Sequence, residues 1–75
     1  MIKYIVRELQ NENSQREGVE IYAHTLRHAK RKANALQLFE GTVLRIESSN
    51  SASVRASDVG LHLSVKKGSR WRDVE

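Results

Sequence analysis

The middle of the chain carries a helical hydrophobic repeat, and the segments on both sides of it alternate with a period of two. Apolar residues recur at the three- and four-residue spacing of one helix face at Leu26, Ala29, Ala33 and Leu36. Phe39 lies near the edge of the same stripe. The hydroxyl of Thr25 can cap the first turn, and Gly41 suits the left-handed position just past a helix end. The sequence therefore predicts one amphipathic helix within residues 25–41, whose alanine-rich stripe can approach a sheet closely.

Two segments before the helix have the alternation of β-strands. Residues 2–9 place apolar side chains on alternate faces, so that Tyr4 and Ile5 lie on opposite sides of the strand. Residues 19–23 alternate in the same way, and the intervening residues 10–18 are polar and end in a glycine. This pattern predicts an antiparallel hairpin with a long loop.

Three or four further strands are predicted after the helix. The segments that alternate most clearly are residues 42–47, 61–67 and 70–74. Between them, the serine-rich residues 48–53 predict a flexible turn, residues 54–56 a brief strand, and Lys67 with Gly68 a tight turn. The order strand, strand, helix, strand, strand, strand predicts an α+β fold. In this fold a small, mostly antiparallel sheet of about five strands carries one amphipathic basic helix on one face.

Length and composition limit the class of protein. A chain of 75 residues has room for a single domain, which we expect to span residues 1–75. The chain has no cysteine, which excludes disulfide bonds, thiolate metal sites and thiol nucleophiles. Its apolar runs are too short to cross a membrane, and its first residues begin a strand instead of a signal peptide. We therefore expect a cytoplasmic protein without membrane contact.

Catalytic and metal-binding chemistry has little support in the sequence. His24 and His28 have the four-residue spacing of two ligands on one helix face, but His24 precedes the predicted N-cap. No glycine-rich loop leads from a strand into a helix, so the sequence offers no phosphate cradle. Glu8 and the other carboxylates around the first loop are interpreted as partly solvated charges. We expect no enzyme activity, no metal, no cofactor and no small-molecule substrate.

The helix has a basic face opposite its apolar stripe. Four helix cations equal the formal net charge of +4 of the whole chain: Arg27, Lys30, Arg31 and Lys32. At about 100° per residue, one side of the helix collects Arg27, Lys30, Asn34 and Gln37, with Arg31 and Leu38 just beyond. Cations and amides on one surface can bind phosphates or an acidic protein surface, and the apolar Leu38 favours a protein. The alternative is a solvated helix face that keeps the domain in solution.

A second basic group lies on the last predicted hairpin and consists of Lys66, Lys67, Arg70 and Arg72. Arg70 and Arg72 alternate with Trp71, so they point to the other side of the strand. Whether this group joins the helix surface depends on which sheet face the helix covers, and both arrangements stay open. Trp71 is interpreted as a core residue and not as a stacking platform. Any nucleic-acid contact is therefore expected to involve the phosphate backbone and to be insensitive to sequence.

A combination of short stretches runs in one order through nearly the whole chain: residues 7–11, 16–18 and 29–31, Gln37, Phe39, residues 41–44 and 63–66, Gly68 and Trp71. In this combination the chain resembles a family of small anti-CRISPR proteins of phages and mobile elements, the ninth numbered family of type I-F inhibitors. The resemblance implies a non-catalytic protein that binds the backbone subunits of the type I-F RNA-guided surveillance complex and blocks target-DNA hybridisation. It also implies that the inhibited complex holds double-stranded DNA nonspecifically.

The resemblance extends to particular positions. Lys30, Arg31 and Gln37 match family positions implied in these contacts. Ala35 stands where the family has a lysine, which weakens the implied DNA effect more than the implied binding to the complex. Residues 48–59 are serine-rich and longer than the family pattern, and the resemblance does not account for them.

A basic inhibitor on a basic DNA channel meets like-charge repulsion. Either the amides of Asn34 and Gln37 pair with lysines of the channel, or Glu12 and Glu17 of the first loop face the channel while the helix faces DNA. Two alternatives to an inhibitor also stay open. One is a phage-encoded accessory protein that binds the nucleic-acid backbone nonspecifically through its basic helix, and the other is a virion or assembly component.

Overall fold

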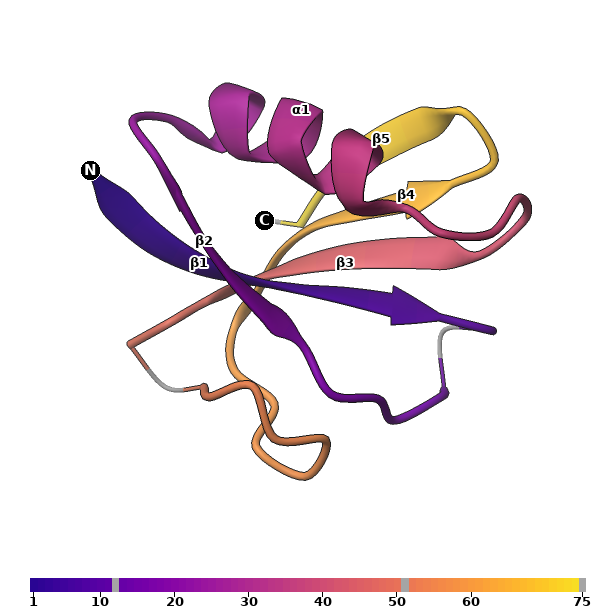
Figure 1. Ribbon diagram of the computed structural model, residues 1–75, viewed down its shortest axis with the longest axis horizontal. Helices are drawn as coiled ribbons and strands as arrows, with labels where there is room; N and C mark the ends of the chain where they lie inside the picture. Colours follow the sequence, from indigo (N-terminus) through magenta and orange to yellow (C-terminus); the bar gives the residue numbers. More distant parts are fainter. Residues whose placement is uncertain (12, 51, 75) are drawn as a thin grey trace.

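The computed structural model describes residues 1–11, 13–50 and 52–74. The elements within these residues are β1 (Ile2–Leu9), β2 (Val19–Ala23), α1 (Leu26–Leu36), β3 (Val43–Ser48), β4 (His62–Lys67) and β5 (Arg70–Asp73). The described strands form a five-stranded sheet in the order β2-β1-β3-β4-β5, with every neighbouring pair antiparallel (Figure 1). The predicted α+β class, the element order and the N-terminal hairpin are therefore confirmed. Glu12 and Ser51, which the sequence places in the two polar loops, lie outside the described residues.

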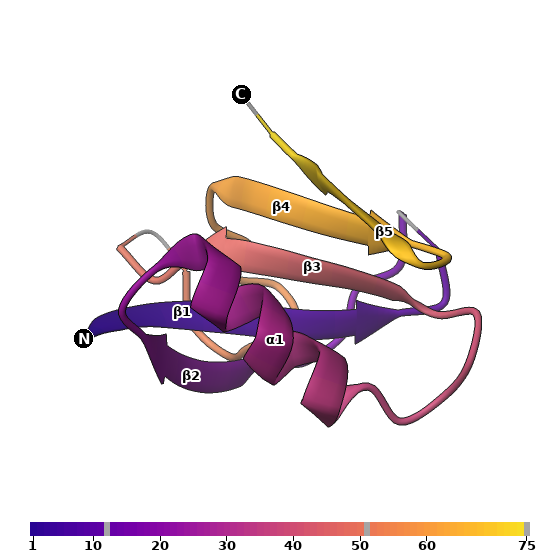
Figure 2. The ribbon, with the colours of Figure 1, turned by 90° about the horizontal axis from the view of Figure 1, so that it is seen from above.

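The helix α1 covers one face of the sheet (Figure 1 and Figure 2). The core between helix and strands consists of Tyr4, Val6, Ile21, Ala23, Ala29, Ala33, Leu44 and Ile46. Ala29 and Ala33 have no exposed surface, because their small side chains let the helix backbone come close to the strands. Leu26 and Trp71 pack at the edges of this core. Burial of each large aliphatic side chain here contributes about 1.5–3 kcal/mol to the free energy of unfolding.

Local chemistry explains where α1 begins and ends. The Thr25 hydroxyl accepts a hydrogen bond from the His28 N–H at 3.1 Å, so the predicted N-cap is confirmed. The prediction that the helix continues toward Gly41 is wrong, because α1 ends at Leu36 and Gln37 already has extended backbone angles. Gly41 does have a positive φ of 80°, but in the turn before β3 and not at the helix end. No helix in the described part of the chain is long and apolar enough to cross a membrane.

Glu8 on β1 accounts for the early end of the helix. Its carboxylate accepts the N–H groups of Leu38 and Phe39, each at 2.9 Å, and the hydroxyl of Thr42 at 2.8 Å. These bonds hold the segment after α1 in a non-helical path and leave the Phe39 side chain 68% exposed, outside the apolar stripe. Burial alone would raise the pKa of Glu8, but the hydrogen bonds from Leu38, Thr42 and Phe39 outweigh it, so its pKa is lowered. Glu8 is therefore a structural anchor and not a merely solvated charge.

The other face of the sheet is covered by the loops that follow β1 and β3 (Figure 1). Arg7 and Glu47 project from this face and are both fully buried, with Arg7 Nε 3.0 Å from Glu47 Oε2. The terminal nitrogens of Arg7 donate at 2.7–2.9 Å to the backbone carbonyls of Arg16, Ser53, Arg55 and Asp58. All five N–H donors of the guanidinium are therefore engaged, which is the condition under which a buried charge is tolerated.

The same contacts explain why residues 54–56 do not form the brief strand predicted for them. The carbonyl of Val54 accepts the Gly18 N–H at 2.7 Å, and the carbonyl of Arg55 accepts from Arg7. Backbone groups used in this way are not available for a strand ladder. Gly18 is needed at this crossing, because a Cβ there would lie 2.6 Å from the Ile5 side chain.

Candidate partner-binding surface

We use the term helix face for the six residues that the sequence selects on and just after α1: Arg27, Lys30, Arg31, Asn34, Gln37 and Leu38. Arg27 and Arg31 lie on the outer side of α1 and are exposed. The side chain of neither arginine forms a hydrogen bond or ion pair with another described residue. Their charges are therefore available to a partner of opposite charge.

Lys30 is not a free cation. Its Nζ lies 2.6 Å from Oδ1 of Asp73 on the edge strand β5, and its side chain is only 22% exposed. The same carboxylate oxygen accepts the Ser64 hydroxyl at 2.9 Å. The hydrogen bonds from Lys30 and then from Ser64 lower the pKa of Asp73, so the carboxylate is ionised at neutral pH. The charge of Lys30 is thus balanced within the protein.

Lys66 joins the helix face, which answers the question that the sequence leaves open. β4 places Lys66 on the sheet face that α1 covers, opposite Leu44 on β3. Its Nζ donates to Asn34 Oδ1 at 2.8 Å and to Gln37 Oε1 at 3.3 Å. The Gln37 side chain also donates to the Thr42 hydroxyl at 3.0 Å. The two amides therefore hold a lysine of this same chain, and their positions are set by it.

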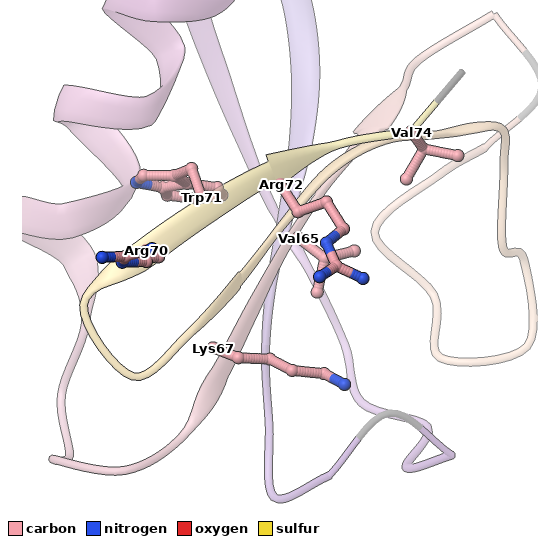
Figure 3. A pocket seen from close by; sticks show the side chains of 6 residues that line it. All are labelled: Val65, Lys67, Arg70, Trp71, Arg72 and Val74. Atoms are coloured by element: carbon pink, nitrogen blue, oxygen red, sulfur yellow. The ribbon is translucent and has the colours of Figure 1, made fainter.

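The rest of the second basic group lies elsewhere. Lys67 and Arg72 point away from the helix, on the side of the hairpin opposite Trp71 (Figure 3). A hollow of about 510 Å³ beside β4 and β5 is lined by Val65, Lys67, Arg70, Trp71, Arg72 and Val74. The pleat of β4 thus divides the predicted group, because Lys66 faces α1 and its neighbour Lys67 does not. The structure forms two separate basic regions.

An apolar patch adjoins the helix face. Leu38 and Phe39 are 79% and 68% exposed, and Leu36 is also exposed. They lie at a groove of about 700 Å³ whose far side includes Val19 at the edge of the sheet. The backbone of this patch is fixed by Glu8, so Leu38 is presented in a defined position and not on a loose helix end.

No protein-family model matches this chain, and no curated protein matches it either. Among solved structures, AcrIF9 matches with a TM-score of 0.80 and 46% sequence identity, over 97% of this chain and 86% of the AcrIF9 chain. The chain belongs to the AcrIF9-like anti-CRISPR family. Membership of the AcrIF9 family confirms the resemblance found in the sequence and agrees with the observed fold.

Sequence reasoning missed three residues that organise this AcrIF9-like fold. Glu8 was interpreted as a partly solvated charge, Arg7 entered only through the resemblance, and Asp73 only as part of the last predicted strand. A weak signal did exist for Arg7, because it sits in an apolar strand register shared with Ile5 and Leu9. Nothing local marks Asp73 as the partner of Lys30, since the two are brought together only by the way α1 crosses the sheet.

Proposed function

We propose that this chain inhibits a type I-F RNA-guided surveillance complex by binding its backbone subunits and blocking hybridisation of target DNA. The observation that carries the proposal is the 46% identity to AcrIF9 over 97% of the chain, together with a TM-score of 0.80. The inhibitor acts by occupying a surface and not by catalysis. Its site of action is the cytoplasm of the bacterial host.

The helix face is the proposed contact. Its effective charge is lower than its composition implies, because Lys30 is paired with Asp73. Arg27 and Arg31 remain for acidic groups of a partner, whereas the amide oxygens of Asn34 and Gln37 already accept hydrogen bonds from Lys66. The pairing of Lys30 with Asp73 lowers the like-charge repulsion that the helix face meets at a basic DNA channel.

Size-exclusion chromatography with a purified type I-F surveillance complex, without DNA and at physiological salt, tests the partner. We expect the chain to co-elute with the complex, because a protein interface with apolar content survives salt that weakens phosphate contacts. Separate peaks would contradict the proposal for that complex.

A pair of charge-matched variants tests the surface. Arg27→Ala/Arg31→Ala removes two exposed cations from α1, whereas Arg55→Ala/Arg72→Ala removes two exposed cations that lie away from α1, one in the loop after β3 and one on β5. Both change the net charge equally, so a general charge effect would lower co-elution in both. We expect only the α1 variant to lose binding, and equal loss would contradict the helix face as the contact.

A second candidate function is nonspecific binding of double-stranded DNA, by the chain alone or by the inhibited complex. The observation in its favour is that Arg27 and Arg31 are exposed and have no acidic partner among the described residues. Binding through about two phosphate contacts should be weak and should lose about tenfold in affinity between about 50 and 200 mM salt. Fluorescence anisotropy with a random-sequence duplex measures this, and affinity that is independent of salt would contradict a phosphate contact.

A further inference from the structure

Asp73 is the acidic residue that neutralises a cation of the helix face. It lies on the edge strand β5, on the same side of the sheet as Trp71 and α1. Lys30 reaches it from α1 with Nζ 2.6 Å from Oδ1. The Asp73 side chain is nevertheless 58% exposed, so it also forms part of the outer surface.

The position of Asp73 is set by buried groups. Ser64 is its register partner on β4 and has no exposed surface. The Ser64 hydroxyl lies 2.9 Å from Asp73 Oδ1 and 3.1 Å from the carbonyl of Arg72. Because the Ser64 hydroxyl already orients the carboxylate, Asp73 loses less side-chain entropy when it pairs with Lys30. The pair is therefore more stable than one formed by a mobile surface acid.

This arrangement has an electrostatic consequence. A surface built only for phosphate binding gains affinity from each free cation that releases a counterion. Here Lys30 is balanced by Asp73, and only Arg27 and Arg31 of the helix-face cations remain without a partner among the described residues. The same pair lowers the affinity for a protein partner less, since the exposed Asp73 carboxylate can accept a hydrogen bond from a cation on that partner.

We propose that Asp73 is a specificity-determining residue: by pairing with Lys30 it lowers the affinity of the helix face for nucleic-acid phosphates and so favours a protein partner. The identity of that partner depends on the proposed function. The effect on phosphate binding does not, because it is a property of the chain alone.

The experiment measures binding of a random-sequence DNA duplex of about 30 base pairs by fluorescence anisotropy over a range of salt concentrations. Asp73→Asn keeps the shape of the side chain and an oxygen for Ser64, but releases the charge of Lys30. We expect about threefold to tenfold tighter binding at about 50 mM salt, and a slope of log affinity against log salt that is steeper by about 0.9. Asp58→Asn removes an exposed acid from the loop on the reverse face and is the charge-matched control.

A second pair of variants shows whether Asp73 acts through Lys30. Lys30→Ala alone is expected to weaken DNA binding, because it leaves the exposed Asp73 carboxylate without its cation. In the Lys30→Ala background, Asp73→Asn should no longer steepen the salt slope. Three results would overturn the proposal. They are a DNA affinity of Asp73→Asn no higher than that of the unmodified chain, an equal increase in affinity in Asp58→Asn, or an undiminished effect of Asp73→Asn on affinity and salt slope in the Lys30→Ala background. Co-elution of the unmodified chain with the surveillance complex is measured separately, so failure of either proposal is recognisable by itself.

Discussion

The two faces of the sheet are closed by different physical means. On one face, α1 buries aliphatic side chains against Ala29 and Ala33, and the buried core of this contact is apolar. On the other face, the irregular loops are held by one guanidinium, Arg7, whose five donors are all bonded to Glu47 and to loop carbonyls. The apolar face tolerates changes that keep volume, whereas the polar face depends on a network in which each missing bond leaves another buried group unsatisfied.

The largest expected effect is on the polar face. Arg7→Ala should lower the free energy of unfolding by about 3–5 kcal/mol, because Glu47 and several carbonyls lose their buried donor. Urea denaturation measures the loss, with Arg55→Ala as an exposed arginine control that should change stability little. A loss below about 1 kcal/mol for Arg7→Ala would mean that water replaces the guanidinium and that the loops do not depend on it.

The apolar face is tested by overpacking. Ala33→Leu inserts volume where the side chain has no exposed surface and should destabilise the fold by about 1–3 kcal/mol. Ala35→Leu makes the same change on the exposed side of the same helix and should be close to neutral. Thermal unfolding of both variants gives the comparison. Equal stability of the two would show that α1 can move away from the sheet at little cost.

Glu8 is a polar residue that stabilises the apolar side of the molecule, because its carboxylate sets the path of the segment after α1. Glu8→Gln should cost about 1 kcal/mol at neutral pH, since a neutral amide accepts the N–H groups of Leu38 and Phe39 less strongly. The folded pKa of Glu8 is lowered, so its contribution is full above the ordinary value of 4.5 and is lost as the pH falls through the lower folded value. The free energies of unfolding of the unmodified chain and of Glu8→Gln should therefore become equal in acid. A difference that stays constant with pH would contradict the role assigned to the Glu8 carboxylate.

The smallest effect concerns the first turn of α1. Thr25→Ala removes the oxygen that accepts the His28 N–H and should cost about 1 kcal/mol, whereas Thr25→Ser should retain most of the cap. Denaturant midpoints of the two variants check this. If serine and alanine were equally destabilising, the threonine methyl and not its hydroxyl would be the stabilising group.

The same contrast explains what the sequence could predict. The five strands, the N-cap and the part of the apolar stripe formed by Leu26, Ala29 and Ala33 follow from short-range patterns, and the structure confirms them. Leu36, which the stripe also included, is exposed. The predictions for the helix end and for residues 54–56 were wrong because a side chain distant in sequence determines the backbone path there. This side chain is Glu8 at the helix end and Arg7 at residues 54–56. A pattern along one segment contains no information about such a partner.

In the candidate surface, too, some features follow from local sequence patterns and others depend on the tertiary fold. Arg27 and Arg31 were predictable as outward-facing cations from helical spacing alone. The pairing of Lys30 with Asp73 and the contact of Lys66 with Asn34 were not, because both depend on which sheet face α1 covers and on the angle at which it crosses. Charge counted from sequence therefore overstates the cations that this surface offers to a partner.

Inhibition by this chain is tested most directly by target-DNA binding of a purified type I-F surveillance complex after incubation with the chain. We expect the unmodified chain and Arg55→Ala/Arg72→Ala to abolish hybridisation of target DNA, while Arg27→Ala/Arg31→Ala requires at least about tenfold more protein for the same inhibition. Undiminished hybridisation in the presence of saturating unmodified chain would contradict the proposed inhibition.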